Sequence, residues 1–432
     1  MLHTPTVPPP LGPWRSGSLW HAAGMPYEFS PRAREVLADV TSFMDDHVYP
    51  NEEAFAAEAA ACGTGDPPLL DKLKAAARER GLWNLFLPHL SADAPGTKLS
   101  NLDYAPVSEQ LGKVEFASEL LNCSAPDTGN MEILNRYGSE RVKQQWLAPL
   151  LEGEIRSGFS MTEPDVASSD AANVSLRIDR RGDTYVLNGT KWFTSGALRD
   201  RCKVLIVMGK TNPGAPKHLQ QSMLVVPKDS PGLSIGRHPQ VFGYTDEWVG
   251  GHPEIHYDDV EVPADNLLGE DGGGFAIAQA RLGPGRIHHC MRTIGVAERA
   301  LALMIDRAVA RFAFGTRVVD KGLIQDWIAE SRIDIDMARE YVLHAANVMD
   351  TEGNKAAASQ IAGIKVVVPN IALRVIDRAI QVHGAAGVTQ FTPLAAMYAH
   401  VRTLRIADGP DEVHKMTIAR REIRRRDPTF GR

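Results

Sequence analysis

Cysteine is scarce in this chain of 432 residues, and its four cysteines are far apart in sequence: Cys62, Cys123, Cys202 and Cys290. No Cys-x-x-Cys motif is present, so the sequence signals neither a zinc site nor a disulfide framework. We therefore expect free thiols in a reducing compartment, which makes a cytoplasmic location the default.

Long apolar runs are lacking as well. The best stretch, Ile361 to Ile376, is interrupted by Lys365, Pro369 and Asn370, whereas a membrane-spanning helix needs about 18 or more apolar residues in a row. The N-terminus has no positively charged start followed by an apolar segment, so no secretory signal is expected. The sequence predicts no integral membrane association.

A strong excess of one charge is also absent. The formal net charge is −6, with 23% charged and 44% hydrophobic residues. This composition is typical of a globular protein and gives no electrostatic reason to expect nucleic acid as a partner. The one basic run, Arg420 to Arg426, ends a predicted helix, where positive charge complements the helix dipole.

A chain of this length exceeds one ordinary core, so two or three domains or layers are expected. Residues 1–26 are rich in proline and are predicted to form a flexible tail. Residues 27–155 show helical spacing, and Ser30-Pro31 is a typical helix start.

Residues 156–268 show short alternating strands, and Asn188-Gly189 predicts a hairpin turn. Residues 269–432 return to helical spacing, with an apolar seam from Ile328 to Met349. We expect a multi-domain α+β fold with an N-terminal α-helical domain, a central β-barrel or β-sandwich domain and a C-terminal four-helix bundle.

Two familiar motifs are excluded first. Gly272-Gly273-Gly274 follows no βαβ pattern and is not a dinucleotide-binding fingerprint, so we interpret it as a turn between domains. His252 and His256 fall in a predicted strand about 13 Å apart, too far to share a metal ion. No metal site is predicted.

Four other segments resemble one known family. Phe159–Asp170 reads F-S-M-T-E-P-D-V-A-S-S-D and resembles the T-E-P-x-x-G-S-D signature of the acyl-CoA dehydrogenase family. Lys191–Gly196 resembles its K-x-W-I-T-N/S-G strand. Arg311–Gly315 resembles its R-x-x-F-G segment, and Gln381–Gly387 its Q-x-x-G-G-x-G segment. Their order, spacing and α–β–α context agree over roughly residues 27–425.

Two further segments, Leu282–His289 and Ala407–His414, resemble one branch of this family. That branch contains the animal members ten and eleven and their bacterial relatives. The animal versions also carry a kinase-like domain, for which this chain has no room.

The resemblance implies bound FAD and assigns its contacts residue by residue. Around the β domain they would be Phe159, Met161, Thr162, Ser168, Ser169, Trp192, Phe193 and Thr194. In the C-terminal region they would be Arg311, Phe314, Gln381, Gly384, Ala385, Gly409, Asp411 and Glu412. In the family, the contacts matched by Arg311 and by Gln381–Ala385 come from a neighbouring subunit, which implies a homodimer or homotetramer.

Roles follow from the same resemblance. Trp192 would shield the flavin ring, and Thr194 would form a hydrogen bond near its N5 atom. Arg286 matches a position near the CoA and substrate entrance. Ser168 matches a substrate-side position, but a one-residue insertion would give that position to Ser169, so the assignment stays open between the two serines.

Asp408 matches the position where most of the family keeps its catalytic glutamate, followed by glycine as here. Some members place the base instead at the site matched by Gly285, which cannot serve. An aspartate is shorter by one bond of about 1.5 Å. We expect burial to raise its pKa towards a value useful for a base, although Asp-Gly-Pro is also a typical turn sequence.

The resemblance thus implies α,β-dehydrogenation of an acyl-CoA, with Asp408 as the base, FAD as the hydride acceptor and an electron-transfer flavoprotein as the partner. One alternative is the branch-specific processing of 4-hydroxyacyl-CoA and 4-phosphoacyl-CoA, with loss of phosphate. Others are an acyl-CoA oxidase and a flavin-binding protein without dehydrogenase turnover.

Overall fold

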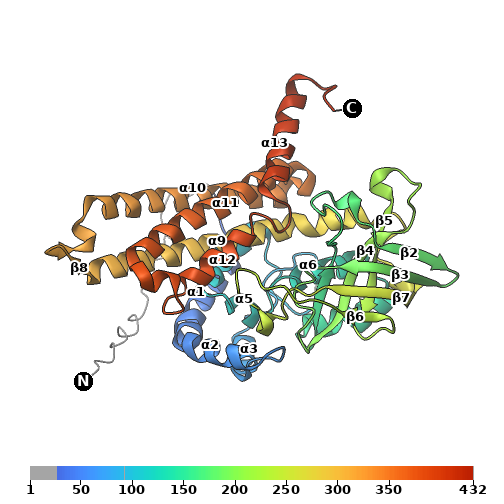
Figure 1. Ribbon diagram of the computed structural model, residues 1–432, viewed down its shortest axis with the longest axis horizontal. Helices are drawn as coiled ribbons and strands as arrows, with labels where there is room; N and C mark the ends of the chain where they lie inside the picture. Colours follow the sequence, from blue (N-terminus) through green and yellow to red (C-terminus); the bar gives the residue numbers. More distant parts are fainter. Residues whose placement is uncertain (1–26, 92, 432) are drawn as a thin grey trace.

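The computed structural model describes residues 27–91 and 93–431 (Figure 1), so the predicted N-terminal tail lies outside the described residues. The first described part is helical, as predicted. The Ser30 hydroxyl accepts a hydrogen bond from the Ala33 backbone N–H, and Pro31 stands in the first turn, where its missing N–H costs nothing. The helices are α1 (Pro31–Phe43), α2 (Glu52–Ala61), α3 (Pro68–Glu79), α4 (Asn101–Gly112), α5 (Ala117–Leu120), α6 (Asp127–Tyr137), α7 (Glu140–Val142) and α8 (Ala148–Leu151).

The middle part is a mixed, curled sheet of seven strands in the order β1-β4-β2-β3-β7-β6, with β5 paired to β4. The pairs β1–β4 and β2–β4 are parallel and the others antiparallel. The strands are β1 (Arg156–Ser160), β2 (Arg177–Arg181), β3 (Thr184–Lys191), β4 (Cys202–Lys210), β5 (Gln221–Pro227), β6 (Leu233–Ile235) and β7 (Ile255–Pro263).

Strand β4 explains how the sheet joins the rest of the molecule. Its alternate residues Val204 and Ile206 belong to the main hydrophobic core, together with the helices. Leu205 and Val207 belong to a second core on the opposite face of the sheet. Because both faces are covered, the strand is a continuous apolar run rather than an alternating one.

The predicted hairpin turn at Asn188-Gly189 is wrong. Strand β3 continues through both residues, and the turn between β2 and β3 lies at Gly182, which has φ +62°. Gly189 marks a register shift in the pairing with β7, and Asn188 bonds across it to the backbone N–H of Asp259 at 3.0 Å. The extra residue of this bulge lies on β7, where Asp258 and Asp259 stand opposite Asn188 alone, and Asp259 takes φ +47°.

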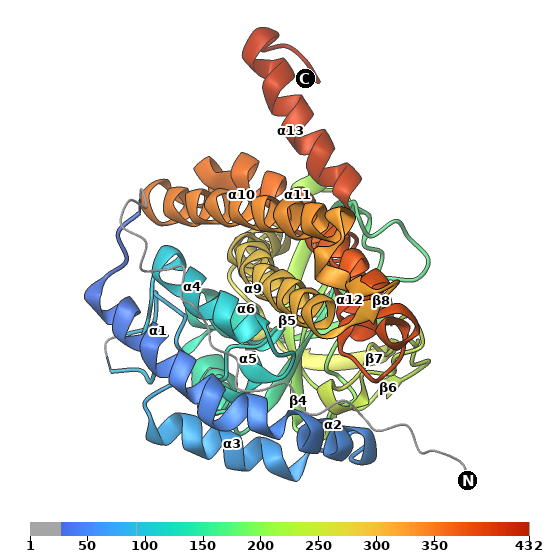
Figure 2. The ribbon, with the colours of Figure 1, turned by 90° about the vertical axis from the view of Figure 1, so that its left-hand side faces the viewer.

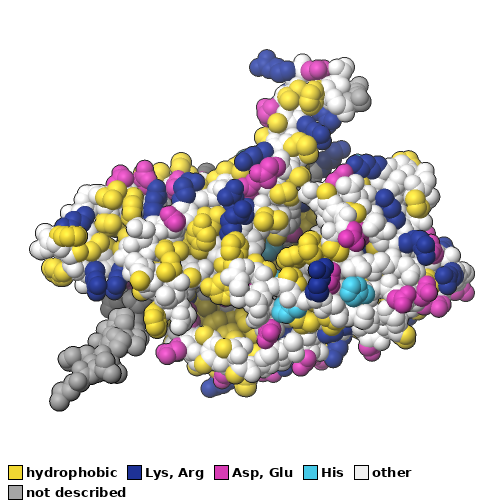
Figure 3. All heavy atoms as spheres, viewed as in Figure 1, with side chains coloured by type: hydrophobic (Ala, Val, Ile, Leu, Met, Phe, Trp, Pro, Cys, Tyr) yellow, Lys and Arg dark blue, Asp and Glu magenta, His cyan; other side chains and the backbone are white. Residues whose placement is uncertain are grey.

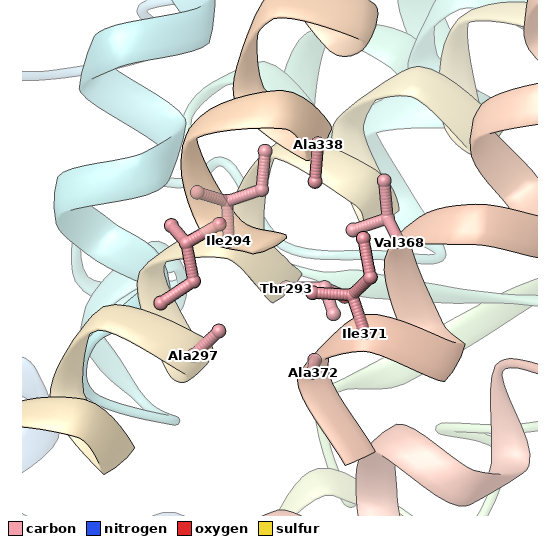
Figure 4. A pocket seen from close by; sticks show the side chains of 8 residues that line it. Thr293, Ile294, Ala297, Ala338, Val368, Ile371 and Ala372 are labelled. Atoms are coloured by element: carbon pink, nitrogen blue, oxygen red, sulfur yellow. The ribbon is translucent and has the colours of Figure 1, made fainter. Parts of the chain in front are cut away.

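The C-terminal part is a helix bundle, as predicted. Helices α9, α10 and α11 lie side by side, and Figure 2 shows them together with α4 and the projecting α13. Eight residues from α9, α10 and α11 enclose an apolar gap with no room for a water molecule (Figure 4), so the bundle interior is tightly packed. The elements are α9 (Gly274–Ala310), β8 (Phe312–Ala313), β9 (Thr316–Arg317), α10 (Gly322–Glu352), α11 (Asn354–His383), α12 (Leu394–Thr403) and α13 (Asp411–Arg426).

Helix α11 is the one described helix long and apolar enough, by length and composition, to cross a membrane. More than half of its most apolar stretch is buried inside the structure, and the helix carries the buried Lys365. These are the properties of the core helix of a bundle. Over the face shown in Figure 3, acidic and basic side chains are interspersed.

Candidate functional site

Asp408 stands in the short connection between α12 and α13, pressed against α9. Its backbone adopts φ +56°, and Gly409 follows with φ +103°. A side chain at Gly409 would approach Nε2 of His414 at 3.0 Å, so this position needs glycine for both space and conformation. The turn predicted for Asp-Gly-Pro is present, and it presents the Asp408 carboxylate, 22% exposed, towards α9.

Two residues one turn apart on α9 contact Asp408. The Nε–H of Arg286 donates to its backbone carbonyl at 2.8 Å. Nε2 of His289 lies 3.4 Å from its Oδ2. Residues three apart share a helix face, so α9 holds both the backbone and the carboxylate of Asp408.

Buried cations surround this carboxylate. Burial alone would raise the pKa of Asp408, but the charge of His289, present only in acid where its ring is protonated, and the charges of Arg281, Arg286 and Lys365 hold that pKa below its usual value. The expectation of a raised pKa is therefore wrong. The sequence suggested the burial, but not that Arg281 and Arg286 of α9 and Lys365 of α11 act together on the same carboxylate.

His289 is neutral in these surroundings. Burial and the nearby charge of Arg292 lower its pKa to about 3. Arg292 reaches its Nδ1 with an NH2–Nδ1 distance of 3.1 Å. The neighbouring His288 points elsewhere and packs edge-on against Phe86, with ring centroids 4.0 Å apart.

Gly285 lies beside this group on α9 and faces open space. A Cβ built there meets no atom within 4 Å. The position that resembles the alternative site of the base is therefore unobstructed, and glycine leaves Asp408 as the only carboxylate at either position.

The two predicted flavin motifs of the β domain are joined to each other. The Thr162 hydroxyl donates to the Trp192 carbonyl at 2.7 Å, and the Trp192 N–H donates to the Thr162 carbonyl at 3.0 Å. Beside them Phe193, with φ +49°, leaves 41% of its surface exposed. Thr194 is buried, and its hydroxyl lies 3.2 Å from that of Ser160 inside the domain.

Sequence reasoning missed the ion pair that fixes this junction. The Lys191 ammonium lies 2.7 Å from Glu163 Oε1 and donates to the Met161 carbonyl at 2.8 Å. Glu163 also accepts the backbone N–H groups of Ser175 and Leu176. Both charged residues were visible in the quoted motifs, as the E of T-E-P and the K of K-x-W.

Arg281 connects this junction to Asp408. Its guanidinium stacks on Phe159 at 3.8 Å from the ring centroid and donates to the Asn130 amide oxygen at 3.0 Å. The charge of Asp408 acts on it as well, although burial lowers its pKa. Arg281 therefore contacts Phe159 directly and lies near enough to Asp408 for their charges to interact.

The structure does not settle the choice between Ser168 and Ser169. The Ser168 hydroxyl bonds within its own loop, accepting from the Glu163 N–H at 2.9 Å. Ser169 is exposed. Both assignments stay predictions.

The remaining predicted flavin residues form a second, distant group. Arg311 and Phe314 belong to the β8–β9 hairpin, at the end of the bundle farthest from the sheet (Figure 1). Gln381, Gly384 and Ala385 lie at the same end. The neighbouring His383 is near Arg307, in the last turn of α9, whose charge helps to lower the pKa of His383. All five are exposed, Phe314 by 99%, and one chain does not bring them to Trp192 and Asp408.

Asp411 and Glu412 begin α13 behind Asp408. Asp411 is buried, and its Oδ2 accepts from Arg405 Nε at 2.8 Å and from Asn370 at 3.0 Å. Its Oδ1 is buried without a hydrogen-bond partner, while Glu412 is exposed. Their contact with FAD stays a prediction.

Among the described residues, one group has the composition of a metal site: Glu115, Asp246 and His400. His400 lies 3.3 Å from Glu115 through Nδ1 and 3.4 Å from Asp246 through Nε2. A metal ion takes only one ring nitrogen, whereas a protonated ring serves both carboxylates. Burial alone would lower the pKa of His400, but the two carboxylates raise it to about 9, so the group is an ion-paired imidazolium.

Comparison with known proteins matches nearly all of the described chain. Models of the acyl-CoA dehydrogenase N-terminal, middle and C-terminal domains match residues 30–154, 158–260 and 272–423, in that order. These three domains, with a carboxylate between the last two helices, define an oxidoreductase fold of the flavoprotein class.

The chain is similar to a probable acyl-CoA dehydrogenase, FadE2, of Mycobacterium tuberculosis: 54% identical, covering 94% of this chain and 99% of that one. It is 53% identical to acyl-CoA dehydrogenase family member 11 of Gallus gallus, covering 91% of this chain but 51% of that protein, so it spans about half the length of that relative. A solved putative acyl-CoA dehydrogenase from Mycobacterium abscessus superimposes with a TM-score of 0.89 at 48% identity, over 93% of this chain and all of that one. The chain belongs to the acyl-CoA dehydrogenase family.

Family membership supports FAD as cofactor, and the residues present fit that group. Trp192 and Phe193 offer aromatic surface that the described chain leaves partly uncovered, beside the polar backbone of the Met161–Glu163 turn. Bound there, FAD would supply the redox chemistry, while the protein supplies position and polarity.

Proposed function

We propose that this protein catalyses the FAD-dependent α,β-dehydrogenation of an acyl-CoA thioester, with Asp408 removing the α-proton. The observation that carries the proposal is the placement of Asp408, which is partly exposed, is contacted by α9 at two points and interacts electrostatically with Arg281, the arginine that stacks on Phe159 of the flavin motif. The β-hydrogen would leave as hydride to the flavin, and the electrons would pass to an electron-transfer flavoprotein.

The low pKa of Asp408 keeps its carboxylate ionised, although it makes the carboxylate a weaker base than the raised pKa expected from the sequence would have done. A base must be ionised before it takes a proton, and the surrounding cations keep the carboxylate ionised at neutral pH. Its short reach requires the α-carbon to approach α9 closely, and the open space at Gly285 gives the substrate room to do so.

The test is anaerobic mixing of the flavin-loaded protein with acyl-CoAs of increasing chain length. Bleaching of the oxidised flavin absorbance is expected with at least one of them, and Asp408→Asn should reduce it to a slow residual rate while flavin stays bound. No bleaching at any chain length, or full activity of D408N, would contradict the proposal.

A second candidate substrate is an acyl-CoA that carries a phosphate on its acyl chain. The reaction would then be the loss of that phosphate, as the branch resemblance implies. Four cations near Asp408 donate only to neutral acceptors: Arg281 to an amide oxygen, Arg286 and Lys365 to backbone carbonyls, and Arg292 to a histidine ring. These four cations outnumber the one carboxylate among them, Asp408, and such an excess of buried positive charge fits an anionic substituent. Release of inorganic phosphate from a 4-phosphoacyl-CoA, but not bleaching by the unsubstituted thioester, would select this reaction.

We also propose that a second copy of the chain completes the flavin site. The two groups of predicted flavin residues lie at opposite ends of one subunit, so one cofactor can touch both only across a subunit interface. A homodimer or homotetramer follows, and sedimentation of the flavin-loaded protein tests it.

A further inference from the structure

His289 is a polar residue beside the carboxylate of Asp408, and no established role accounts for it. It lies on the same face of α9 as Arg286, three residues earlier. Its ring sits between Arg292, 3.1 Å from Nδ1, and Asp408, 3.4 Å from Nε2. One ring nitrogen, Nδ1, therefore faces a positive charge, and the other, Nε2, faces a negative charge.

These contacts fix the proton on the ring. An arginine guanidinium only donates hydrogen bonds, so the Nδ1 atom that meets Arg292 has to accept. In a neutral imidazole the other nitrogen then carries the hydrogen, so the Nε2–H lies on the side of the ring that faces the Asp408 carboxylate. The buried, strongly cationic surroundings keep the ring neutral near pH 7.

We propose that His289 is a positioning residue for Asp408: its Nε2–H aims the short carboxylate at the substrate, and Arg292 selects the tautomer that can do so. This inference rests on the function proposed for Asp408. The distance of 3.4 Å is long for a hydrogen bond, and bonds of this kind often tighten only when substrate fills the site.

The mechanical reason lies in how Asp408 is held. Arg286 fixes its backbone carbonyl at 2.8 Å, but that contact leaves the side-chain torsions free to rotate. His289 reaches Oδ2 and so restrains that rotation. The other oxygen, Oδ1, is left to meet the α-hydrogen, and a misplacement of about 1 Å can cost about a hundredfold in rate.

The first experiment separates aiming from packing by kinetics in four flavin-loaded proteins: wild type, H289L, H289Q and H344Q. The Gln side chain keeps an N–H near the place of Nε2, while Leu keeps only the bulk. We expect H289L to lower kcat about 10- to 100-fold with KM little changed, and H289Q to recover most of the loss. His344 is exposed on α10, so H344Q should match wild type.

Non-additivity tests whether His289 acts through Asp408. Single-turnover bleaching is measured for H289L, D408N and the double variant. If His289 acts by aiming the carboxylate, adding H289L to D408N causes no further loss, because no base is left to aim. The proposal would be overturned if H289L lowered the bleaching rate by a similar factor in wild type and in D408N. Equal rates for H289L and H289Q would overturn it as well.

A spectroscopic readout is independent of turnover. The ring ¹⁵N shifts of His289 in ¹⁵N-histidine-labelled protein, identified by their absence in H289Q, report which nitrogen carries the hydrogen. We expect the Nε2–H tautomer at pH 7 and its loss in R292M. A protonated ring or the Nδ1–H tautomer in wild type would refute the inference, whereas failure of wild type to bleach with any acyl-CoA would refute only the proposed function.

Discussion

Lys191 and Glu163 form an ion pair from which water is excluded: their Nζ and Oε1 atoms are 2.7 Å apart, and their side chains are 0% and 2% exposed. Glu163 belongs to the turn after β1, and Lys191 ends β3. The pair therefore ties together the two segments that carry Thr162 and Trp192, and the ordered junction of the flavin motifs depends on it.

The first prediction removes one partner of this pair. K191M leaves the Glu163 carboxylate buried without its counter-ion, so we expect the free energy of unfolding to fall by about 3–5 kcal/mol. Urea denaturation of the flavin-free protein measures it. The matched control is K203M on β4, where the lysine is exposed and the expected change is within about 0.5 kcal/mol. Equal stability of the two variants would show that the pair contributes nothing.

Much of the fold follows from local patterns, and the exceptions have physical causes. The cap at Ser30 and the strand pattern of β4 are local signals, and both appear in the structure. Asn188-Gly189 misled because Gly189 adopts its positive φ inside strand β3, opposite a bulge of β7, and not in a hairpin turn. The distinction depends on the pairing of β3 with β7, which lies almost 70 residues away.

The candidate site was predictable in its motifs but not in its electrostatics. Asp408, Thr162 and Trp192 stood out through the resemblance, residue by residue. That Lys365 of α11 and Arg281 of α9 converge on Asp408 depends on helix packing over long sequence separations, which no local pattern encodes. The expected direction of the Asp408 pKa was therefore wrong.

A second prediction concerns the open space at Gly285. In D408N the base is gone, and a glutamate introduced by G285E meets no obstruction at its Cβ. Because Gly285 adjoins Arg286, which contacts Asp408, we expect the double variant G285E/D408N to recover part of the flavin bleaching that D408N loses. Stopped-flow absorbance measures the recovery.

The control for this rescue is G322E/D408N. Gly322, at the start of α10, is also exposed to open space, but at the far end of the bundle. It should recover nothing. Equal recovery of bleaching in both double variants would mean that the glutamate need not lie near residue 408, and would contradict the placement of Gly285 beside Asp408.

A third prediction tests the shared flavin site by complementation. D408N damages the group near the sheet, and R311E damages the distant group. If each flavin site combines the two groups from different subunits, a hybrid of the variants contains one intact site. Random pairing then gives roughly a quarter of the wild-type activity. Co-expression of D408N with W192A, two variants in the group near the sheet, should give no activity. Co-expression of D408N with R311E should also give no activity if one subunit holds a whole flavin site, and that result would contradict the prediction.

The last prediction concerns pH and the imidazolium of His400. This residue of α12 joins Glu115 of the N-terminal helical part to Asp246 of the loop before β7, and the ring of Tyr244 packs beside it at 5.5 Å. Its folded-state pKa is about 9, above the ordinary 6.5. The stabilisation is therefore complete below about pH 6.5 and is lost as the pH rises towards 9. Glu115 is 53% exposed, so screening reduces the effect, and we expect the free energy of unfolding to fall by about 1–2 kcal/mol over that range.

Denaturant titrations from pH 6 to 9.5 measure this slope, and H400Q should remove it because its amide does not titrate. If the slope persists unchanged in H400Q, other groups cause it, and His400 does not hold α12 to the rest of the molecule through its charge.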